Sequence, residues 1–266
     1  MDPTPDHGES SYEGHGLLTG RRALITGGDS GIGRAVALAY AREGADVAIV
    51  YLPQEQPDAD ETARLVEEAG RTCVLIPTDL CDEQAARAAV VRAATELGGL
   101  DILVNNAGYQ MARRESIADI TSQDLDRTFK TNLYALFWVT QTALEHLEEG
   151  SVIINNSSIQ AYQPSETLLD YASTKAAINN FTVNLAAEVG SRGIRVNAVA
   201  PGPIWTPLQP ATQLPAKIEK FGSDTPLGRA GQPAEVAPAF VFLAADSTAS
   251  YVSGTVLGVT GGKPVF

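Results

Sequence analysis

The chain has 266 residues, of which 44% are hydrophobic and 19% charged, and a formal net charge of −13. This balance is typical of a globular protein and excludes a disordered chain, while the negative charge disfavours nucleic acid and anionic membranes as partners. No apolar stretch reaches the ~18 residues of a membrane-spanning helix, and the acidic, polar N-terminus is unlike a signal peptide, so we expect a cytoplasmic protein.

The metal-ligating residue types are few and scattered. The cysteines are Cys73 and Cys81, and the histidines are His7, His15 and His146. Their spacing matches no zinc motif. We therefore expect no metal site, and we interpret the cysteines as structural thiols in a reducing compartment.

The predicted elements follow one pattern along the chain. Residues 1–20 are rich in Gly, Pro, Ser and acidic residues, which predicts an N-terminal tail without a core of its own that can still pack on the domain. From residue 21 onward, short β-branched segments alternate with long periodic segments such as 82–97 and 121–147. The candidate strands lie within residues 21–28, 46–52, 72–80, 100–108, 151–158, 195–203 and 255–262.

Several of these strands are apolar nearly throughout, as expected where helices cover both faces of a parallel sheet. No change in composition after residue 20 marks a second domain. We therefore predict an α/β fold of the Rossmann type, with a doubly wound sheet of about seven parallel strands flanked by helices on both faces. Residues 21–266 would form a single domain.

A glycine-rich stretch, TGGDSGIGR at 26–34, separates the first predicted strand from the first predicted helix. Glycine permits a sharp turn and a close approach to a phosphate, and a helix N-terminus attracts negative charge. The spacing G-x-x-x-G-x-G differs from the common dinucleotide fingerprint, so a tight turn before a helix is the alternative. Asp79–Leu80 and the NNAG motif at 105–108 also follow strands, where ligands of open α/β sheets bind.

Tyr171 and Lys175 lie four residues apart in a predicted helix at about 168–190, which aligns them one turn apart. Ser158 lies thirteen residues before Tyr171. A tyrosine and a lysine at this spacing can also stack on a helix surface without a function. Ser157 competes with Ser158, because adjacent residues of an extended segment point to opposite sides.

Taken together, the glycine spacing, NNAG, Asn132, Ser158, Tyr171, Lys175 and the Pro-Gly pair at 201–202 resemble the short-chain dehydrogenase/reductase family, single-domain branch, over residues 21–262. In more detail, the segments MDPTPDHGESSYEGHG, YLPQEQPDA, SSIQAYQPS and VAPGPIWTPLQP resemble bacterial general-stress-type oxidoreductases or aldehyde reductases. The resemblance implies an NAD(P)-dependent oxidoreductase that interconverts a carbonyl and an alcohol by hydride transfer. The thirteen-residue spacing of that family selects Ser158 over Ser157.

Carbonyl reduction requires an acid for the developing alkoxide, and free tyrosine, with a pKa of about 10, is a poor match to neutral pH. An ammonium one helical turn away favours the phenolate, so we expect Lys175 to lower the pKa of Tyr171, the general acid/base. The resemblance implies that Lys175 also binds the nicotinamide ribose, that Ser158 orients the carbonyl, and that Asn132 supports a proton relay. Asn132 could instead satisfy a backbone group locally.

The cofactor would be NAD or NADP. The acid that usually holds the ribose of NAD at the end of the second strand is replaced by Tyr51, which favours NADP, whereas Asp29 counts against a phosphate and Arg34 lies inside the first helix. The residues expected to bind the cofactor are Gly27, Asp29, Ser30, Gly31, Ile32, Gly33, Tyr51, Asp79, Leu80, Asn105, Ala107, Gly108, Tyr171, Lys175, Pro201, Gly202, Ile204 and Thr206.

The Pro-rich segment Ile204–Gly231 is expected to form a lid over the catalytic end. The candidate substrate residues are Gln110, Gln160, Tyr162 and Trp205, together with Tyr109, and they suggest a small polar or mixed substrate. The resemblance implies a homotetramer in which helices near 121–147 and 168–190 pack between subunits. Two alternatives stay open: a non-catalytic dinucleotide sensor on the same fold, and a methyltransferase, which would have no use for the Tyr-Lys pair.

Overall fold

A single sheet organises the computed structural model, which describes residues 3–114, 116–213 and 218–266. Within these residues, seven parallel strands pair in the order β3-β2-β1-β4-β5-β6-β7, so the predicted fold class is confirmed. Most strand residues are β-branched or leucine and are buried, as a sheet covered on both faces requires. The strands are β1 (Arg22–Thr26), β2 (Asp46–Tyr51), β3 (Cys73–Pro77), β4 (Ile102–Asn105), β5 (Val152–Asn156), β6 (Arg195–Pro201) and β7 (Val256–Val259).

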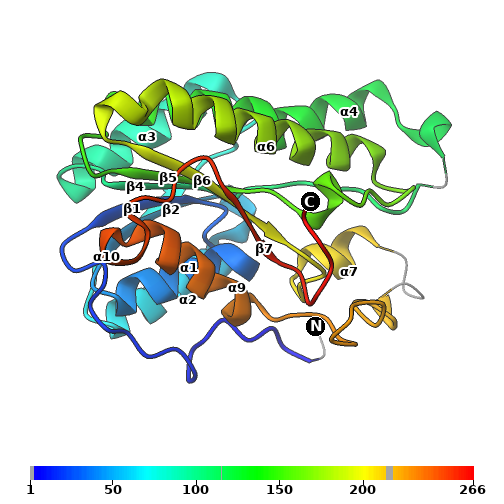
Figure 1. The fold of residues 1–266 in the computed structure, drawn as a ribbon, viewed down its shortest axis with the longest axis horizontal. Helices are drawn as coiled ribbons and strands as arrows, with labels where there is room; N and C mark the ends of the chain where they lie inside the picture. Colours follow the sequence, from blue (N-terminus) through cyan, green and yellow to red (C-terminus); the bar gives the residue numbers. More distant parts are fainter. Residues whose placement is uncertain (1–2, 115, 214–217) are drawn as a thin grey trace.

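Helices cover the two faces of this sheet (Figure 1). On one face, α1 (Gly31–Arg42), α2 (Gln56–Glu68) and α9 (Pro233–Ala244) enclose one hydrophobic cluster. On the other face, α3 (Glu83–Leu97), α5 (Ala135–Ala143) and α6 (Leu169–Val189) enclose a second cluster. The shorter elements are α4 (Ser122–Phe129), α7 (Leu208–Thr212), α10 (Asp246–Ala249) and 3₁₀ turns at Pro53–Glu55, Ile117–Asp119, Ile159–Ala161 and Gly190–Arg192.

The two long periodic segments behave differently. Residues 83–97 form the expected helix, which begins where the Asp82 side chain accepts a hydrogen bond from the Ala85 amide. The predicted helix over 121–147 forms as one run of helical backbone over 122–143: α4 ends at Phe129 and continues through a π-helical turn at Lys130–Tyr134 into α5, which ends at Ala143. A π-helical turn takes up one extra residue without ending the helix, so the periodic pattern predicts the helix but not the turn inside it.

The binding edge of the sheet lies beside β1, where the strand order reverses. β1 pairs with β2 on one side and with β4 on the other. The loops that leave β1 and β4 therefore run to opposite faces of the sheet. In open α/β sheets this divergence creates a crevice at the carboxyl ends of the strands. The loops after β1, β4, β5 and β6 all reach this edge.

Residues 3–20 contain no helix or strand and run along the face formed by α1 and α9 (Figure 1). Leu18 of this segment is only 1% exposed and belongs to the core cluster on that face. The expected tail therefore packs along its length on the rest of the chain. Among the described residues, no helix is long and apolar enough to cross a membrane.

Candidate active site

A cleft of about 1330 Å³ opens at the carboxyl edge of the sheet, where the loops after β1, β4, β5 and β6 meet. The structure brings most of the predicted site residues together in its lining. These residues are Gly27, Asp29, Ser30, Gly31, Ile32, Tyr51, Asp79, Leu80, Ala107, Gly108, Gln110, Ser158, Gln160, Tyr171, Lys175, Pro201, Gly202, Ile204 and Thr206. Residues between Gly27 and Thr206, about two-thirds of the chain, thus contribute to one site.

The glycine-rich loop forms a cradle at the start of α1. Gly27 and Gly31 have positive φ angles of 63° and 50°, which L side chains rarely adopt. A Cβ at Gly33 would overlap the carbonyl oxygen of Gly27, so the helix can approach the loop only because residue 33 is glycine. The side chain of the N-cap residue Ser30 makes no capping hydrogen bond, which leaves the helix N-terminus suited to an anion. This cradle fits the pyrophosphate of a dinucleotide.

Asn106, which the sequence analysis did not single out within NNAG, holds this loop in place. Its amide nitrogen donates hydrogen bonds to the carbonyl oxygens of Thr26 (3.0 Å) and Gly27 (2.8 Å). Its amide oxygen accepts a hydrogen bond from Asn156 at 2.8 Å. The ends of β1, β4 and β5 are therefore joined beneath the cleft.

Ser158, Tyr171 and Lys175 meet at the centre of the cleft. Ser158 follows β5; its hydroxyl accepts a hydrogen bond from the Gln160 amide at 3.1 Å and lies close enough to the Tyr171 phenol to lower the pKa of that phenol. The Lys175 ammonium lies 5.4 Å from the centroid of the Tyr171 ring and donates a hydrogen bond to the carbonyl oxygen of Asn156 at 2.6 Å. The Ser157 hydroxyl instead donates to the Asn179 side chain on α6 at 2.5 Å. This geometry places Ser158 rather than Ser157 beside the tyrosine.

Burial dominates the electrostatics of the Tyr-Lys pair. Desolvation raises the pKa of Tyr171 to about 12, and the nearby Ser158 hydroxyl offsets only part of this rise. Desolvation also lowers the pKa of Lys175 to about 7. The expected lowering of the Tyr171 pKa by Lys175 is therefore not found in the protein alone, because a buried lysine that is partly neutral at pH 7 stabilises a phenolate only weakly.

Asn132 lies in the π-helical turn and is 2% exposed. Its amide oxygen accepts a hydrogen bond from the Tyr109 backbone amide at 2.7 Å, and its amide nitrogen donates to the Tyr109 carbonyl oxygen at 2.9 Å and to the Thr174 hydroxyl at 3.1 Å. Asn132 therefore satisfies a backbone segment that is distant in sequence, not its own turn, and connects the loop after β4 to α6 behind Lys175.

Five of the predicted residues lie outside the cleft lining. Gly33 and Asn105 have supporting positions, since Asn105 donates to Thr140 (3.0 Å) and Asn155 (2.9 Å) inside the core. Trp205 faces away from the cleft because it alternates with Ile204 and Thr206 along an extended segment. Its indole instead donates to the Pro3 carbonyl oxygen at 2.8 Å. The complete set outside the lining is Gly33, Asn105, Asn132, Tyr162 and Trp205.

The end of the cleft next to β2 carries acidic groups. Asp29 is 4% exposed, and burial raises its pKa. Burial also raises the pKa of Glu55, with a further contribution from the nearby Asp29 charge. Arg34 is the cation of this region, and its guanidinium donates to the Asp29 carbonyl oxygen at 2.9 Å and to the Asp58 carboxylate at 3.1 Å. Tyr51 also lines this end of the cleft.

The other end of the cleft is bounded by amide side chains on three segments. Gln110 is 4% exposed and donates a hydrogen bond to the Thr212 hydroxyl of α7 at 3.1 Å. The Gln160 side chain accepts a hydrogen bond from the Ser165 amide at 2.6 Å. Sequence reasoning did not select the further lining residues Gln163, Gln209, Thr212 and Gln213. Their shared amide and hydroxyl chemistry was visible in the sequence, but their convergence depends on how α7 folds back over the cleft.

A Rossmann-type sheet, a phosphate cradle at its first helix and a Ser-Tyr-Lys group in the same cleft define a dinucleotide-dependent oxidoreductase. A family model described as enoyl-(acyl carrier protein) reductase matches residues 27–263. General stress protein 39 of Bacillus subtilis is 54% identical over 263 residues, which cover 99% of this chain and 91% of that protein. NADPH-dependent aldehyde reductase 1, chloroplastic, of Arabidopsis thaliana is 46% identical over 270 residues, covering 100% of this chain and 93% of that protein.

Among solved structures, a short-chain dehydrogenase of Burkholderia cenocepacia in complex with NADP has a TM-score of 0.85 and 38% identity, covering 92% of this chain and 98% of that one. The chain belongs to the short-chain dehydrogenase/reductase family, and the predicted resemblance is confirmed. It is an NAD(P)-dependent oxidoreductase.

Proposed function

We propose that this oxidoreductase reduces a small polar aldehyde or ketone, with Tyr171 as the proton donor and Ser158 as the group that orients the carbonyl. The observation that carries the proposal is the position of the Ser158 hydroxyl beside the Tyr171 phenol, in the same cleft as the glycine cradle. Two hydroxyl donors that converge on one point can both reach a single carbonyl oxygen, as stabilisation of a developing alkoxide requires.

NAD(P)H supplies the hydride when it is bound. The cradle of Gly27, Gly31 and Gly33 would hold its pyrophosphate, because the backbone there is open and the α1 N-terminus faces the cleft. Lys175 would hold the nicotinamide ribose, since an ammonium has three donors and the Asn156 carbonyl oxygen uses one of them. Lys175 is thereby a positioning group for the dinucleotide as well as a neighbour of Tyr171.

The raised pKa of Tyr171 favours one direction of the reaction. In carbonyl reduction Tyr171 must carry its proton, and a pKa of about 12 keeps it protonated at neutral pH. Alcohol oxidation needs the phenolate, which this burial disfavours. We therefore propose that the chain works chiefly as a reductase near neutral pH and oxidises alcohols faster as the pH rises. The relative named as an NADPH-dependent aldehyde reductase supports this direction.

The substrate end of the cleft supports a neutral, hydrogen-bonding substrate. Gln110, Gln160 and Gln209 offer amide donors and acceptors without a formal charge, which suits the hydroxyl groups of a neutral substrate. The test is a panel of small hydroxylated aldehydes, apolar aldehydes and keto acids, each assayed with NADH and with NADPH. Faster turnover of the hydroxylated aldehydes supports the proposal, and a preference for keto acids or apolar aldehydes contradicts it.

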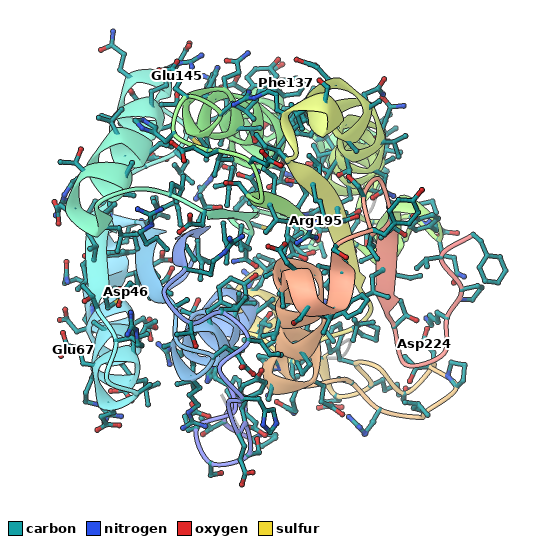
Figure 2. All side chains as sticks on the ribbon, turned by 60° about the vertical axis from the view of Figure 1, so that its left-hand side comes forward. Asp46, Glu67, Phe137, Glu145, Arg195 and Asp224 are labelled. Atoms are coloured by element: carbon teal, nitrogen blue, oxygen red, sulfur yellow. The ribbon has the colours of Figure 1, made fainter. Side chains whose placement is uncertain are left out.

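We also propose that the chain assembles as a homotetramer through α4, α5 and α6. Apolar side chains along these helices are unusually exposed: Leu125, Tyr134, Phe137, Leu169 and Val183 are 41 to 52% exposed. Phe137 is labelled on the outer side of α5 in Figure 2, and its ring packs edge-on against Phe181 of α6. Light scattering of wild type and Phe137→Glu tests this: a tetramer that dissociates in the variant supports it, and a monomeric wild type contradicts it. A cytoplasmic location stays a prediction, which cell fractionation would test.

A further inference from the structure

The N-terminal segment is fixed to the end of α1 by two charged side chains. The Arg42 guanidinium donates hydrogen bonds to the carbonyl oxygens of Gly8 (2.8 Å) and Tyr12 (2.5 Å). The Glu43 carboxylate accepts hydrogen bonds from the Tyr12 hydroxyl (2.6 Å) and from the Leu17 amide (2.9 Å). Glu43 is 1% exposed, so this carboxylate is held almost entirely by the N-terminal segment. Such charge-assisted hydrogen bonds form a firm anchor.

Beyond this anchor, the N-terminal segment reaches both ends of the region that covers the cleft. The described part of this region is residues 204–213 and 218–231. At the first end, the Trp205 indole donates a hydrogen bond to the Pro3 carbonyl oxygen at 2.8 Å. At the second end, the Asp6 amide donates to the Gln232 side chain at 3.1 Å, and the Ala234 amide donates to the Asp6 carbonyl oxygen at 3.0 Å. The beginning of the described N-terminal segment lies beside this region in Figure 1.

The two ends of this covering region are hydrogen-bonded to each other. The Trp205 amide donates to the Gly231 carbonyl oxygen at 2.8 Å, and the Gly231 amide donates to the Pro203 carbonyl oxygen at 2.9 Å. A short parallel bridge links Ile204 with Gly231. The N-terminal segment therefore binds to a unit that consists of these two hydrogen-bonded ends and forms the base of the cleft cover.

Trp205 connects this unit to the cofactor site. Its neighbours Ile204 and Thr206 line the cleft. Thr206 packs against the glycine cradle, since a Cβ added to Gly31 would lie 3.2 Å from the Thr206 Cβ. Any displacement of Trp205 must therefore move a wall of the phosphate cradle.

We infer that residues 3–8 form a strap that holds the base of the cleft cover, with Trp205 as the positioning residue through which the strap acts on cofactor binding. The inference rests on the proposed cofactor site. In the absence of the strap, Trp205 loses its indole partner, and residues 204–206 sample positions in which Thr206 no longer flanks the cradle. The strap thus gives the N-terminal segment an effect on the dinucleotide, although none of the described residues 3–20 lines the cleft.

The test compares three variants of the full chain. Deletion of residues 2–5 removes the Pro3 acceptor and leaves the Arg42 and Glu43 anchor intact. Trp205→Phe keeps an aromatic ring near Phe221 and removes only the indole donor. Trp138→Phe on α5 is the matched control, because the sequence has two tryptophans and Trp138 lies on the opposite face of the sheet.

NADH and NADPH binding is measured by nicotinamide fluorescence, and cleavage at the exposed Lys220 by trypsin is followed in the cofactor-free protein. The deletion and Trp205→Phe should each weaken binding about three- to tenfold, the effect of one lost hydrogen bond of ordinary strength, and should speed cleavage by a similar factor. Trp138→Phe should do neither. In the Trp138→Phe background, the deletion should also shift the emission of Trp205 to longer wavelength, as expected for an indole newly exposed to water.

The inference is overturned if both strap variants bind cofactor and resist trypsin as wild type does, or if Trp138→Phe produces the same losses. If the deletion variant fails to fold, Trp205→Phe alone decides. If wild type binds neither dinucleotide, the proposed cofactor site fails, and the trypsin and emission measurements on the free protein still decide whether the strap holds residues 204–206.

Discussion

The burial of Lys175 predicts how the stability of the protein depends on pH. Desolvation lowers its pKa from 10.5 in the unfolded chain to about 7 in the folded protein without cofactor. Below pH 7 the amine is charged in both states, and the folded protein bears the full cost of burying an ammonium. Above pH 10.5 the amine is neutral in both states, and that cost is absent. Stability should therefore rise with pH between these limits.

The slope follows from proton linkage. In this window the unfolded chain binds up to one more proton at Lys175 than the folded protein, so the free energy of unfolding increases by at most about 1.4 kcal/mol per pH unit. Lys175→Met removes this contribution. From pH 7 to pH 9, the free energy of unfolding of wild type should therefore gain about 2 kcal/mol relative to Lys175→Met. Below pH 6 the difference between the two proteins should be constant.

Equilibrium unfolding in urea, at equal protein concentration and without cofactor, measures this difference at each pH. The range stops at pH 9 because Tyr171, whose pKa is raised from 10.0 to about 12, has the opposite sign: its contribution is lost as the pH rises through 10 to 12. Lys220→Met at an exposed lysine is the control and should follow wild type. A wild-type curve parallel to that of Lys175→Met from pH 6 to 9 would refute the reasoning, since Lys175 would then titrate as a solvated amine.

Three further predictions concern the supports of the site. Arg114 (Nη1) and Asp170 (Oδ2) form a buried ion pair at 2.8 Å beside Tyr171. Asp170→Asn should lower the free energy of unfolding by about 3 kcal/mol, because it leaves a buried guanidinium poorly compensated. Arg114→Met in the same chain should restore part of this loss, and thermal unfolding measures both effects. Asp29→Asn should improve NADPH binding relative to NADH by about three- to tenfold, because a carboxylate at this end of the cleft repels a 2′-phosphate; equal effects on both cofactors in fluorescence titrations would place Asp29 away from the phosphate. Gly33→Ala should weaken the binding of both cofactors by tenfold or more, on the order of the 1 to 3 kcal/mol of an overpacked site. Gly190→Ala, where φ is negative and a Cβ meets nothing within 4 Å, should leave binding unchanged in the same titrations.

The parts of the fold that depend on local pattern were predictable from the sequence. The seven strands are short, apolar and separated by periodic helices, so neighbouring residues alone reveal them. The glycine cradle was equally legible, because Gly31 and Gly33 stand between a strand and a helix. Ser158 required more than local pattern, since only the thirteen-residue spacing of a known family distinguished it from Ser157.

The parts that depend on distant contacts were not predictable. Asn132 pairs with the backbone of Tyr109, and no pattern near residue 132 indicates that partner. Trp205 was expected to face a substrate, but its indole binds Pro3, a residue about two hundred positions earlier in the chain. The expected pKa of Tyr171 considered the charge of Lys175 without the burial that both side chains share. Burial is a property of the whole fold, so the direction of this shift could not be obtained from a spacing of four residues.

The measurement that tests the account most directly is a single turnover by Tyr171→Phe on the best aldehyde of the panel, with cofactor binding followed in the same samples. The variant loses one hydroxyl and keeps the ring above Lys175. We predict that the rate of hydride transfer falls by about 10²- to 10⁴-fold, the range typical of general acid catalysis, while dinucleotide affinity stays within about threefold of wild type. A variant that transfers hydride at the wild-type rate would contradict the account, because the proton would then come from another group.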